Sequence, residues 1–503
     1  MIKVFLLLML FVSSTLFAQN VGIGITPPTN RLHVFSAADP LRLEGLQSGT
    51  STDSILTVTN TGVLKRRSNL VIGNGWSLAG NTATNPATAF LGTTDKIAFS
   101  IRTNNLRSAF LDPDSSKRNN AFGYRALNTA ITGEGNTAIG FLSLSKITSG
   151  IYNISIGDSA SWNLTSGFNN IAIGADALAT VATASGNIAI GSNALKNTVS
   201  SENIAIGNQA LANNNVGSNL LAIGANALLN NQTNFTQLAI GNNALSQTNA
   251  GLENVAIGYN AGTSLVTASY NVLLGHYAFS SASNASNNTI LGHNAGLAYT
   301  ATGNTNNTFL GYQAGFSQTT GTGNTYIGAN VDLPTVVSIS NSTGLGQGVQ
   351  ITASNQVRVG NTSVSSIGGQ VGWSTLSDAR IKANIKEDVH GLDFIMRLRP
   401  VTYNYDLEKL QRLQGVQKIN YKTDAAFEQL RFSGFLAQEV QQAADAAHYD
   451  FSGVDKPSNE HTAYGLRYAE LVVPLVKAMQ EMKAMLDQQQ KEIEQLKKLL
   501  EAR

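Results

Sequence analysis

The sequence predicts a mainly β protein, in which a β-roll or β-solenoid shaft with coils of about 17 residues precedes an α+β domain that ends in a coiled-coil helix. Two observations predict the shaft: glycines recur at a nearly constant spacing over about 200 residues, and large and small residues alternate within each repeat. A third predicts the second domain, because charged residues and helical periodicity become frequent only after Trp373. The 503 residues suffice for more than one domain, since single cores rarely grow beyond about 250–300 residues.

Residues 1–18 have the pattern of a secretory signal peptide. A lysine precedes an apolar run from Val4 to Val12, which is too short to span a bilayer, and small residues up to Ala18 follow. We therefore expect export through the Sec route and a location outside the cell or at its surface. A buried N-terminal helix is the alternative. The chain contains no cysteine, which excludes disulfides, thiol catalysis and cysteine-ligated zinc.

Composition excludes some partners. Only 13% of the residues are charged and the net charge is +2, so neither a nucleic acid nor an anionic membrane is expected to bind. No other segment is apolar and long enough to predict a membrane span. We expect no cofactor and no metal.

Residues 19–119 predict irregular β-structure at one end of the shaft. The segment "NVGIGITPPTNRLHVFS" alternates like a strand pair interrupted by Pro27 and Pro28. The segment "SILTVTNTGVLKRR" is typical of a hairpin, with Thr61 and Gly62 at the turn.

Residues 120–330 consist of repeats such as "NIAIGADAL", "NIAIGSNAL" and "NVAIGYNAG". Neighbouring anchor glycines are 16, 17 or 19 residues apart, and 17 is by far the commonest spacing. Seventeen residues are too few for a helix-turn-helix repeat, which needs about 34, so each repeat predicts one coil of a β-solenoid. The anchor glycines are Gly123, Gly140, Gly157, Gly174, Gly191, Gly207, Gly224, Gly241, Gly258, Gly275, Gly292, Gly311 and Gly328.

Within one repeat, a short strand precedes the glycine. In "NIAIG", Ile188 and Ile190 point to one side and Ala189 to the other, and the glycine permits a turn. Ala194 and Leu195 then predict a second short inward-facing segment. Stacked coils would align isoleucines and asparagines in columns.

The repeats carry little catalytic chemistry. They contain five carboxylates, which do not recur in the paired arrangement that glycoside hydrolysis needs. His276 and His293 occupy equivalent positions of neighbouring coils, and we expect an aligned surface pair rather than a metal site. The five carboxylates are Glu134, Asp158, Asp176, Glu202 and Glu253.

Residues 331–376 predict the final coils and a neck. The repeats, with their "AIGxxA" core, resemble the β-roll heads of trimeric autotransporter adhesins. The resemblance extends into "NSTGLGQGVQITASNQVRVGNTSV", in which Gly346 and Gly360 are 14 residues apart.

Residues 377–503 predict the α+β domain, and residues 468–503 predict a coiled coil. The heptad contains apolar residues at nearly every core position, with the polar Gln489 in the seam. Such a stripe predicts self-association, although the pattern alone does not give the number of strands; a helix folded back on its own domain is the alternative. Heptad positions a are Val472, Met479, Leu486, Ile493 and Leu500, and positions d are Tyr468, Leu475, Met482, Gln489 and Leu496.

Three ordered segments, "LSDARIKANI", "FSGFLAQEVQ" and "LRYAELVVPLVKAMQEM", resemble the intramolecular chaperone domain of phage tail spikes and endosialidases, the peptidase S74 family. The whole chain is similar to secreted tail fiber domain-containing proteins. The resemblance implies a domain that trimerises, templates the folding of the upstream fibre and cleaves itself off. It places the cut between Leu376 and Ser377 and implies a catalytic dyad of Ser377 and Lys382, which would act once on its own chain.

These residue types suit that chemistry. A serine hydroxyl needs a base, and a lysine serves as one when burial or a neighbouring cation lowers its pKa. Arg380 is a candidate for that cation, and Asp378 for the group that fixes the turn between Ser377 and Lys382. The alternative is a capped loop in which Ser377 or Asp378 is merely a helix N-cap.

The function that we predict from the sequence is a secreted homotrimeric surface fibre, adhesin-like, whose chaperone cleaves itself. The alternatives are a glycan-degrading spike enzyme and a fibre that keeps its chaperone uncleaved. Each of these hypotheses allows a cell-surface or glycan ligand, and the sequence does not identify it.

Overall fold

The structure is a computed structural model, and its chain forms two compact units, one up to Gly92 and one from Thr93 onward. The predicted signal peptide and the predicted turn at Thr61 and Gly62 lie outside the described residues. No helix among the described residues is long and apolar enough to cross a membrane. The structure describes residues 21–23, 32–34, 55–58, 64–67, 90–128, 130–233, 235–334, 338–415 and 425–502.

Two strand pairs are described in the first unit. Strand β1 (Val21–Ile23) pairs in parallel with β2 (Leu32–Val34). Strand β3 (Ile55–Val58) pairs antiparallel with β4 (Leu64–Arg67), as expected for the predicted hairpin.

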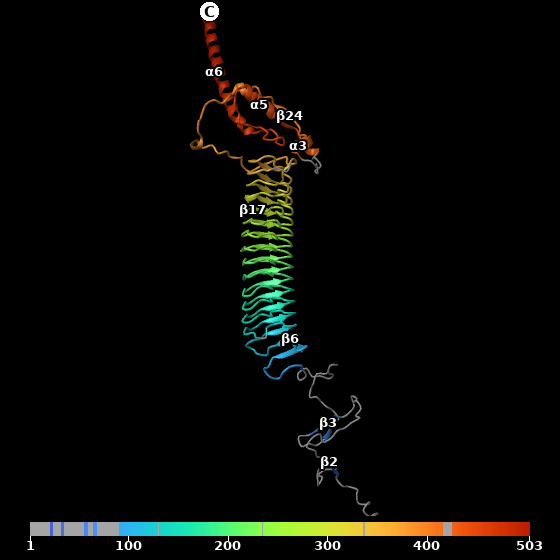
Figure 1. Cartoon of the computed structure of the whole chain (residues 1–503). Coiled ribbons are helices and arrows are strands. Elements are labelled where there is room, and N and C mark those ends of the chain that lie inside the picture. Colours follow the sequence, from blue (N-terminus) through green and yellow to red (C-terminus); the bar gives the residue numbers. More distant parts are fainter. Residues whose placement is uncertain are drawn as a thin grey trace, which may run out of the picture. The chain divides into compact units, whose positions relative to one another are not determined.

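The second unit contains the shaft, which is a β-solenoid with one short strand per coil, as predicted (Figure 1). Strands β5 (Phe99–Thr103) and β6 (Leu106–Leu111) start it as an antiparallel pair, and β6 pairs antiparallel with β7 (Asn120–Phe122). From β7 onward every pairing along the ladder is parallel and in register, so that Ile188 of one coil lies beside Ile204 of the next.

The remaining strands of the ladder are β8 (Thr137–Ile139), β9 (Ile154–Ile156), β10 (Ile171–Ile173), β11 (Ile188–Ile190), β12 (Ile204–Ile206), β13 (Leu221–Ile223), β14 (Leu238–Ile240), β15 (Val255–Ile257), β16 (Val272–Leu274), β18 (Thr289–Leu291), β20 (Thr308–Leu310), β21 (Thr325–Ile327), β22 (Thr343–Leu345) and β23 (Val357–Val359). A side pair of β17 (Asn284–Ser286) and β19 (Thr302–Asn304) flanks them.

Alanine, rather than isoleucine, faces the interior of the solenoid. The middle residue of each strand, such as Ala189 and Ala222, is fully buried against the second inward segment, where Leu195 and Leu228 are also fully buried. The first and third residues of the strands point outward, and Ile206 remains 36% exposed. The sequence predicted that the two faces of each strand differ. The structure shows that the alanine face is the inner one and that the larger isoleucines lie on the outside of the solenoid.

The core keeps its volume where the inner alanine becomes large. In the later coils the middle strand residue becomes large, as at Leu273 and Phe309, and a glycine replaces leucine at the second inward position of the coil before (Gly262) or of the same coil (Gly315). A Cβ on Gly262 would lie 2.6 Å from Leu273, and one on Gly315 would lie 2.8 Å from the Phe309 ring. Close packing therefore couples the two positions.

A buried asparagine column runs along the shaft beside the strands. The Oδ1 of Asn153 accepts the backbone amide of Asn170 at 3.0 Å, and the Nδ2 of Asn170 donates to the carbonyl of Ala184 at 2.9 Å. Each side chain thus satisfies buried backbone groups of neighbouring coils, which explains why a polar residue recurs inside. On the surface, the rings of His276 and His293 stack with centroids 5.8 Å apart, as the sequence predicted.

The anchor glycines from Gly123 to Gly328 lie where the backbones of two coils approach closely. A Cβ on Gly224 would lie 2.6 Å from the carbonyl carbon of Gly241, and the φ of Gly224 is 127°. Both facts exclude a side chain, because the obstacle is backbone that the next coil holds in place.

We therefore expect Gly224→Ala to destabilise the shaft by roughly 3 kcal/mol or more, from strain and a backbone clash. Gly303→Ala is the matched control, because Gly303 has a φ of 85° but nothing lies within 4 Å of the place that its methyl group would take. It should cost only about 1–2 kcal/mol. Denaturant unfolding followed by circular dichroism measures both, and equal costs would contradict the close approach.

A second prediction concerns Asp332, a largely buried carboxylate in the last coils. Burial raises its pKa to about 6, although it accepts the backbone amide of Ser317 at 2.9 Å. Because the folded pKa lies above the unfolded value of about 3.9, the folded state favours the protonated acid, and stability falls as pH rises from about 4 to about 6.

Asp332→Asn should therefore stabilise these coils at pH 7.5, by up to about 3 kcal/mol, and should make little difference near pH 4. Unfolding measured across this pH range checks the prediction. Parallel pH profiles for the two proteins would contradict it.

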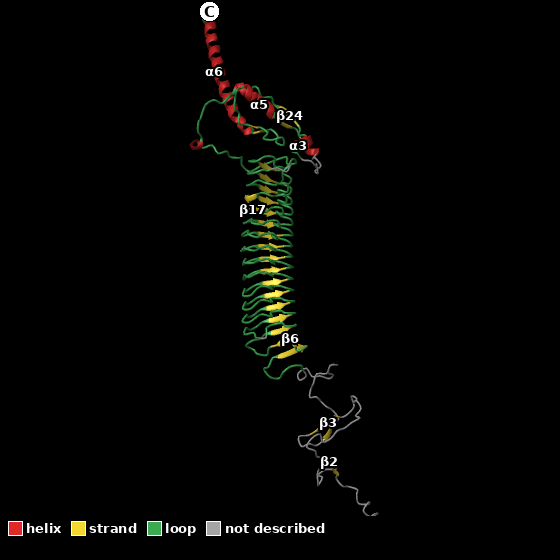
Figure 2. Cartoon of the chain, viewed as in Figure 1, coloured by secondary structure: helices red, strands yellow, loops and turns green. Residues whose placement is uncertain are grey.

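The C-terminal domain is α+β, as predicted, and Figure 2 shows its helices beyond the shaft. Its core packs Phe394, Val440, Ala444, Phe451 and Leu471. Its elements are η1 (Ala379–Ile381), α2 (Leu392–Ile395), β24 (Val401–Tyr403), α3 (Leu407–Leu413), α4 (Ala425–Gln429), β25 (Phe432–Gly434), α5 (Ala437–Ala446), β26 (Val454–Asp455), β27 (Gly465–Leu466), η2 (Tyr468–Leu471) and α6 (Val472–Glu501).

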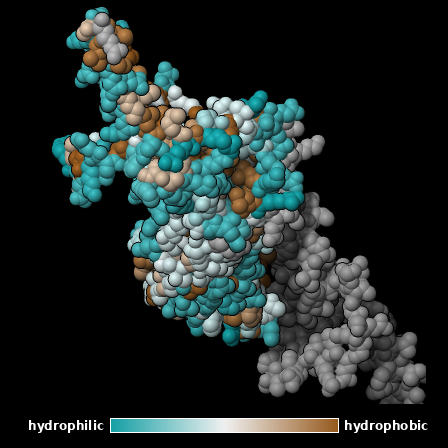
Figure 3. All heavy atoms as spheres, turned by 90° about the horizontal axis from the view of Figure 1, so that it is seen from above, coloured by the Kyte–Doolittle hydropathy of each residue, from teal (hydrophilic) through white to brown (hydrophobic). Residues whose placement is uncertain are grey.

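Helix α6 leaves its heptad stripe uncovered in the single chain. Only Pro474 and Ala478 are buried along its 30 residues. Met479 is 66% exposed and Leu486 is 58% exposed. Hydrophobic side chains are accordingly visible among hydrophilic ones in the surface view (Figure 3). Most of the helix is thus not folded back on its own domain.

Candidate active site

Ser377 and Lys382 lie together in the segment that joins the last strand of the shaft to the C-terminal domain. The Nζ of Lys382 donates to the Oγ of Ser377 at 2.7 Å. The two residues come from the same chain and stand at opposite ends of the short helix η1. This is the distance at which a base can take the proton of a hydroxyl nucleophile.

Asp378 folds the chain so that the pair can meet. It is the N-cap of η1, and its Oδ1 accepts the backbone amide of Arg380 at 2.9 Å. The amide of Lys382 donates to the carbonyl of Ala379 at 3.2 Å and closes the turn. A fully extended segment would place Ser377 and Lys382 on opposite faces, so the single helical turn is what brings their side chains together. The same turn therefore fits both interpretations of this segment, the capped loop and the catalytic dyad.

Arg380 is paired with Asp378 and not directed at Lys382. Its Nε lies 3.1 and 3.0 Å from the two carboxylate oxygens of Asp378, and a terminal nitrogen lies 2.5 Å from one of them. The Arg380 side chain and backbone amide lower the pKa of Asp378, and Asp378 in turn raises the pKa of Arg380. The guanidinium thus braces the turn, and the expectation that it acts as a cation on Lys382 gains no support from its position.

The dyad is open to solvent in the single chain. Ser377 and Lys382 are both exposed, and so are the apolar side chains around them. Trp373 is 94% exposed, Leu376 81% and Ile385 74%. Large apolar groups that cluster at such exposure are typical of interaction surfaces. One chain therefore brings the Ser377 hydroxyl and the Lys382 amine together without enclosing them.

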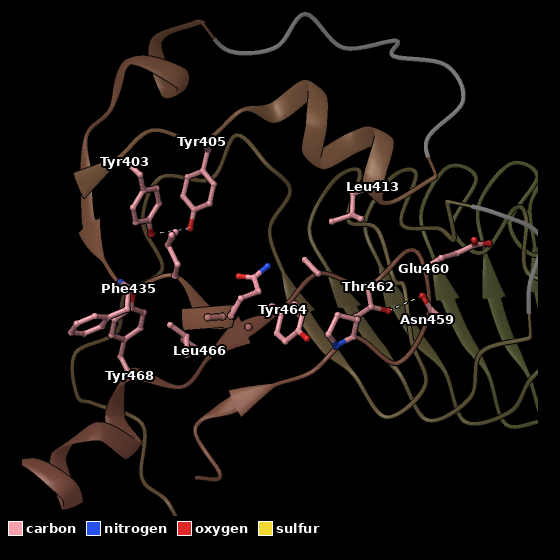
Figure 4. Close-up of a pocket in the computed structure, with 16 residues that line it drawn as sticks. Tyr403, Tyr405, Leu413, Phe435, Asn459, Glu460, Thr462, Tyr464, Leu466 and Tyr468 are labelled. Atoms are coloured by element: carbon pink, nitrogen blue, oxygen red, sulfur yellow. Dashed lines mark hydrogen bonds between the residues drawn. The ribbon is translucent and has the colours of Figure 1, made fainter. Parts of the chain in front are cut away.

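The domain also contains an aromatic cavity that sequence reasoning missed. It has a volume of about 730 Å³ and is lined by Tyr403, Tyr405, Phe435, Tyr464 and Tyr468, among others (Figure 4). The hydroxyl of Tyr468 accepts the backbone amide of Phe435 at 3.0 Å and fixes one wall. The hydrogen bond to Tyr405 raises the pKa of Tyr403 to about 12. The lining comes from several separate segments, so no local motif could reveal it.

Comparison with known families supports the interpretation of this part of the chain. Residues 377–449 match the family model Peptidase_S74, chaperone of endosialidase. The match begins at Ser377, the residue that follows the predicted cleavage point. Shaft and chaperone domain together form a tail-fibre-like architecture. No curated protein and no solved structure shows significant similarity to the chain.

The geometry of η1 separates the roles of Asp378 and Arg380. Asp378→Ala removes this N-cap, loosens the turn and should slow the self-cleavage that the sequence predicts at the Leu376–Ser377 bond roughly fivefold or more. Arg380→Ala keeps the backbone amide that Asp378 caps and should change the rate less than about threefold. A time course on denaturing gels measures both rates; a larger effect at Arg380 would contradict these roles.

Proposed function

We propose that the protein is an exported, adhesin-like homotrimeric surface fibre, whose C-terminal chaperone domain templates the assembly of three chains and then cleaves itself between Leu376 and Ser377. The observation that carries the proposal is the 2.7 Å contact between Ser377 and Lys382 at the first residue of the chaperone match, directly beyond the last coils of the shaft. The exposed ligand-binding surface would be the shaft, with a cell-surface or glycan ligand.

The contact supports one sequence of bond changes. Lys382, as the free amine, takes the proton of the Ser377 hydroxyl, while Oγ attacks the carbonyl carbon of Leu376. The C–N bond between Leu376 and Ser377 breaks, and its nitrogen receives the proton from Lys382. The resulting ester between Leu376 and the Ser377 oxygen is hydrolysed by water. The products are a shaft that ends in the Leu376 carboxylate and a chaperone domain that begins at the Ser377 amine.

The outward face of the shaft supports assembly of several copies. Parallel sheets are normally covered on both faces. Here the alanine face is covered by the coil's own leucines, whereas the isoleucine face of the ladder is uncovered in one chain. Ile139 and Ile327, near the two ends of the ladder, are 39% and 38% exposed. Two neighbouring copies in register would cover this column along its whole length, and the uncovered heptad of α6 would join the same three chains.

Cleavage after assembly has a kinetic rationale. Long solenoids depend on pairings that form slowly and whose exposed edges favour misassociation. A helix that trimerises early raises the local concentration of the three shafts. Removing the chaperone domain afterwards leaves the fibre without the helix that started assembly. The trimeric fibre would then persist because it unfolds slowly.

The experiment compares the full chain with Ser377→Ala and Lys382→Met. The unaltered protein should release the 127 residues from 377 to 503, seen as two bands on a denaturing gel, with Ser377 as the new N-terminus by mass spectrometry. Both variants should stay intact while keeping the same oligomeric state.

Ser374→Ala is the matched control, since it removes an exposed hydroxyl three residues away and should cleave normally. An unaltered chain that stays intact once assembled would refute self-cleavage and would favour the fibre that keeps its chaperone.

A further inference from the structure

A loop of the chaperone domain, residues 457–462, rests on the last coil of the shaft. The Nδ2 of Asn459 donates to the backbone carbonyl of Thr352 at 2.9 Å, across 107 positions of sequence. Figure 4 shows Asn459 and Thr462 on this loop, with the coils of the shaft behind them. Thr352 itself is buried in the shaft.

The bond gives this end of the shaft a partner that does not belong to the ladder. In the middle of the shaft, coils are bonded on both sides: Leu211 donates to the carbonyl of Ala227 in the next coil, and the carbonyl of Ala210 accepts from Leu195 in the previous one. In the last coil, the carbonyl of Val349 and the amide of Ile351 are both bonded to Asp332 of the coil before. Strand β23 still follows, but among the described residues no backbone hydrogen bond joins residues 349–352 to later residues, and the side-chain amide of Asn459 supplies a donor there.

The loop is shaped in advance for this contact. The Oδ1 of Asn459 accepts the backbone amide of His461 at 2.9 Å and the hydroxyl of Thr462 at 2.8 Å. With its oxygen held inside the loop, the Asn459 amide presents its nitrogen to the shaft. The ring of His461 also contacts the carbonyl of Leu413 at 3.3 Å, which ties the loop to the end of α3.

A small cavity lies beside this hydrogen bond. Its volume is about 390 Å³, and its walls come from both parts of the second unit. Ile339, Ile351 and Ser354 line it from the shaft, and Ser458, Asn459 and His461 line it from the loop. The loop therefore covers apolar side chains of the last coil as well as its backbone.

We propose that residues 457–462 form a removable end cap, which docks on the last complete coil of its own chain, at the end where no further complete coil stacks. An open solenoid end presents unpaired backbone groups and apolar surface, and a terminal cap is the usual remedy in repeat proteins. The cap can seat only when the last coil has formed. The chaperone domain is therefore held in position only when the shaft is complete. Removal of the cap rests on the self-cleavage proposed above, since release of the chaperone domain would uncover the shaft end.

Cysteine cross-linking tests the docking without relying on cleavage. The chain contains no cysteine, so a Ser354→Cys, Ser458→Cys pair in the uncleavable Ser377→Ala background gives a specific probe. A short bismaleimide should link the two positions within one chain, detected as a cross-linked peptide by mass spectrometry. Asn213→Cys with Ser458→Cys is the control, because Asn213 is exposed but lies in the middle of the shaft, and it should not react within the chain.

Two outcomes would overturn the cap. The first is the absence of the Ser354–Ser458 link although both thiols react singly with a maleimide. The second is a link between chains, seen as a band of twice the chain mass, which would place the loop on a neighbouring copy.

Asn459→Ala tests the positioning role. It should reduce the cross-link yield and slow self-cleavage at least about threefold, while the melting temperature of the middle coils stays unchanged. Unaltered cross-linking and cleavage in Asn459→Ala would refute the role of this side chain. If the unaltered chain does not cleave at all, self-cleavage is refuted, and the cross-link alone decides whether the cap exists.

Discussion

The structure depends on the close approach of one coil to the next. Backbone amides and carbonyls pair in parallel register along the ladder, and at the end of each strand the backbones come so near that only glycine fits. Asparagine recurs directly before the strands because its amide reaches backbone groups of a neighbouring coil, as Asn153 and Asn170 do, although Leu220 and Ser342 take this place in two coils. The composition of the shaft, rich in glycine, asparagine and alanine, follows from this one requirement.

The same requirement leaves each chain incomplete. Alanine on the inner side lets the coil close on itself, and the larger apolar residues are displaced to the outer face, where one chain has nothing to cover them. The heptad of α6 and the apolar residues around Ser377 are uncovered as well. Three separate parts of the chain thus require a partner surface, and a set of identical chains in register would satisfy all of them together. The family model that residues 377–449 match, chaperone of endosialidase, fits a fibre shaft with a C-terminal chaperone.

Sequence reasoning reached the features that are local and repeated. The period, the strand positions, the stacked pair of His276 and His293 and the long C-terminal helix all follow from spacing alone. The sequence left open which face of each strand points into the solenoid, because the alternation of large and small residues defines two faces and does not say which is the inner one. The alanine face is the inner one because, in most coils, the buried leucines of the second inward segment leave room only for a small side chain. Ser377 and Lys382 were identified by resemblance, but their contact depends on the turn that Asp378 caps. The bond from Asn459 to Thr352 could not be predicted, because no pattern links positions 107 residues apart.

The proposed trimeric fibre requires the isoleucine face of the shaft to be an interface between identical chains. Sedimentation equilibrium of the shaft after removal of residues 377–503 measures this most directly, because neither the chaperone nor α6 can then hold the chains together. We predict that the cleaved shaft sediments with the mass of three chains and keeps this mass on dilution. A shaft that sediments as a single folded chain would contradict it, since the isoleucine columns would then face water with no partner.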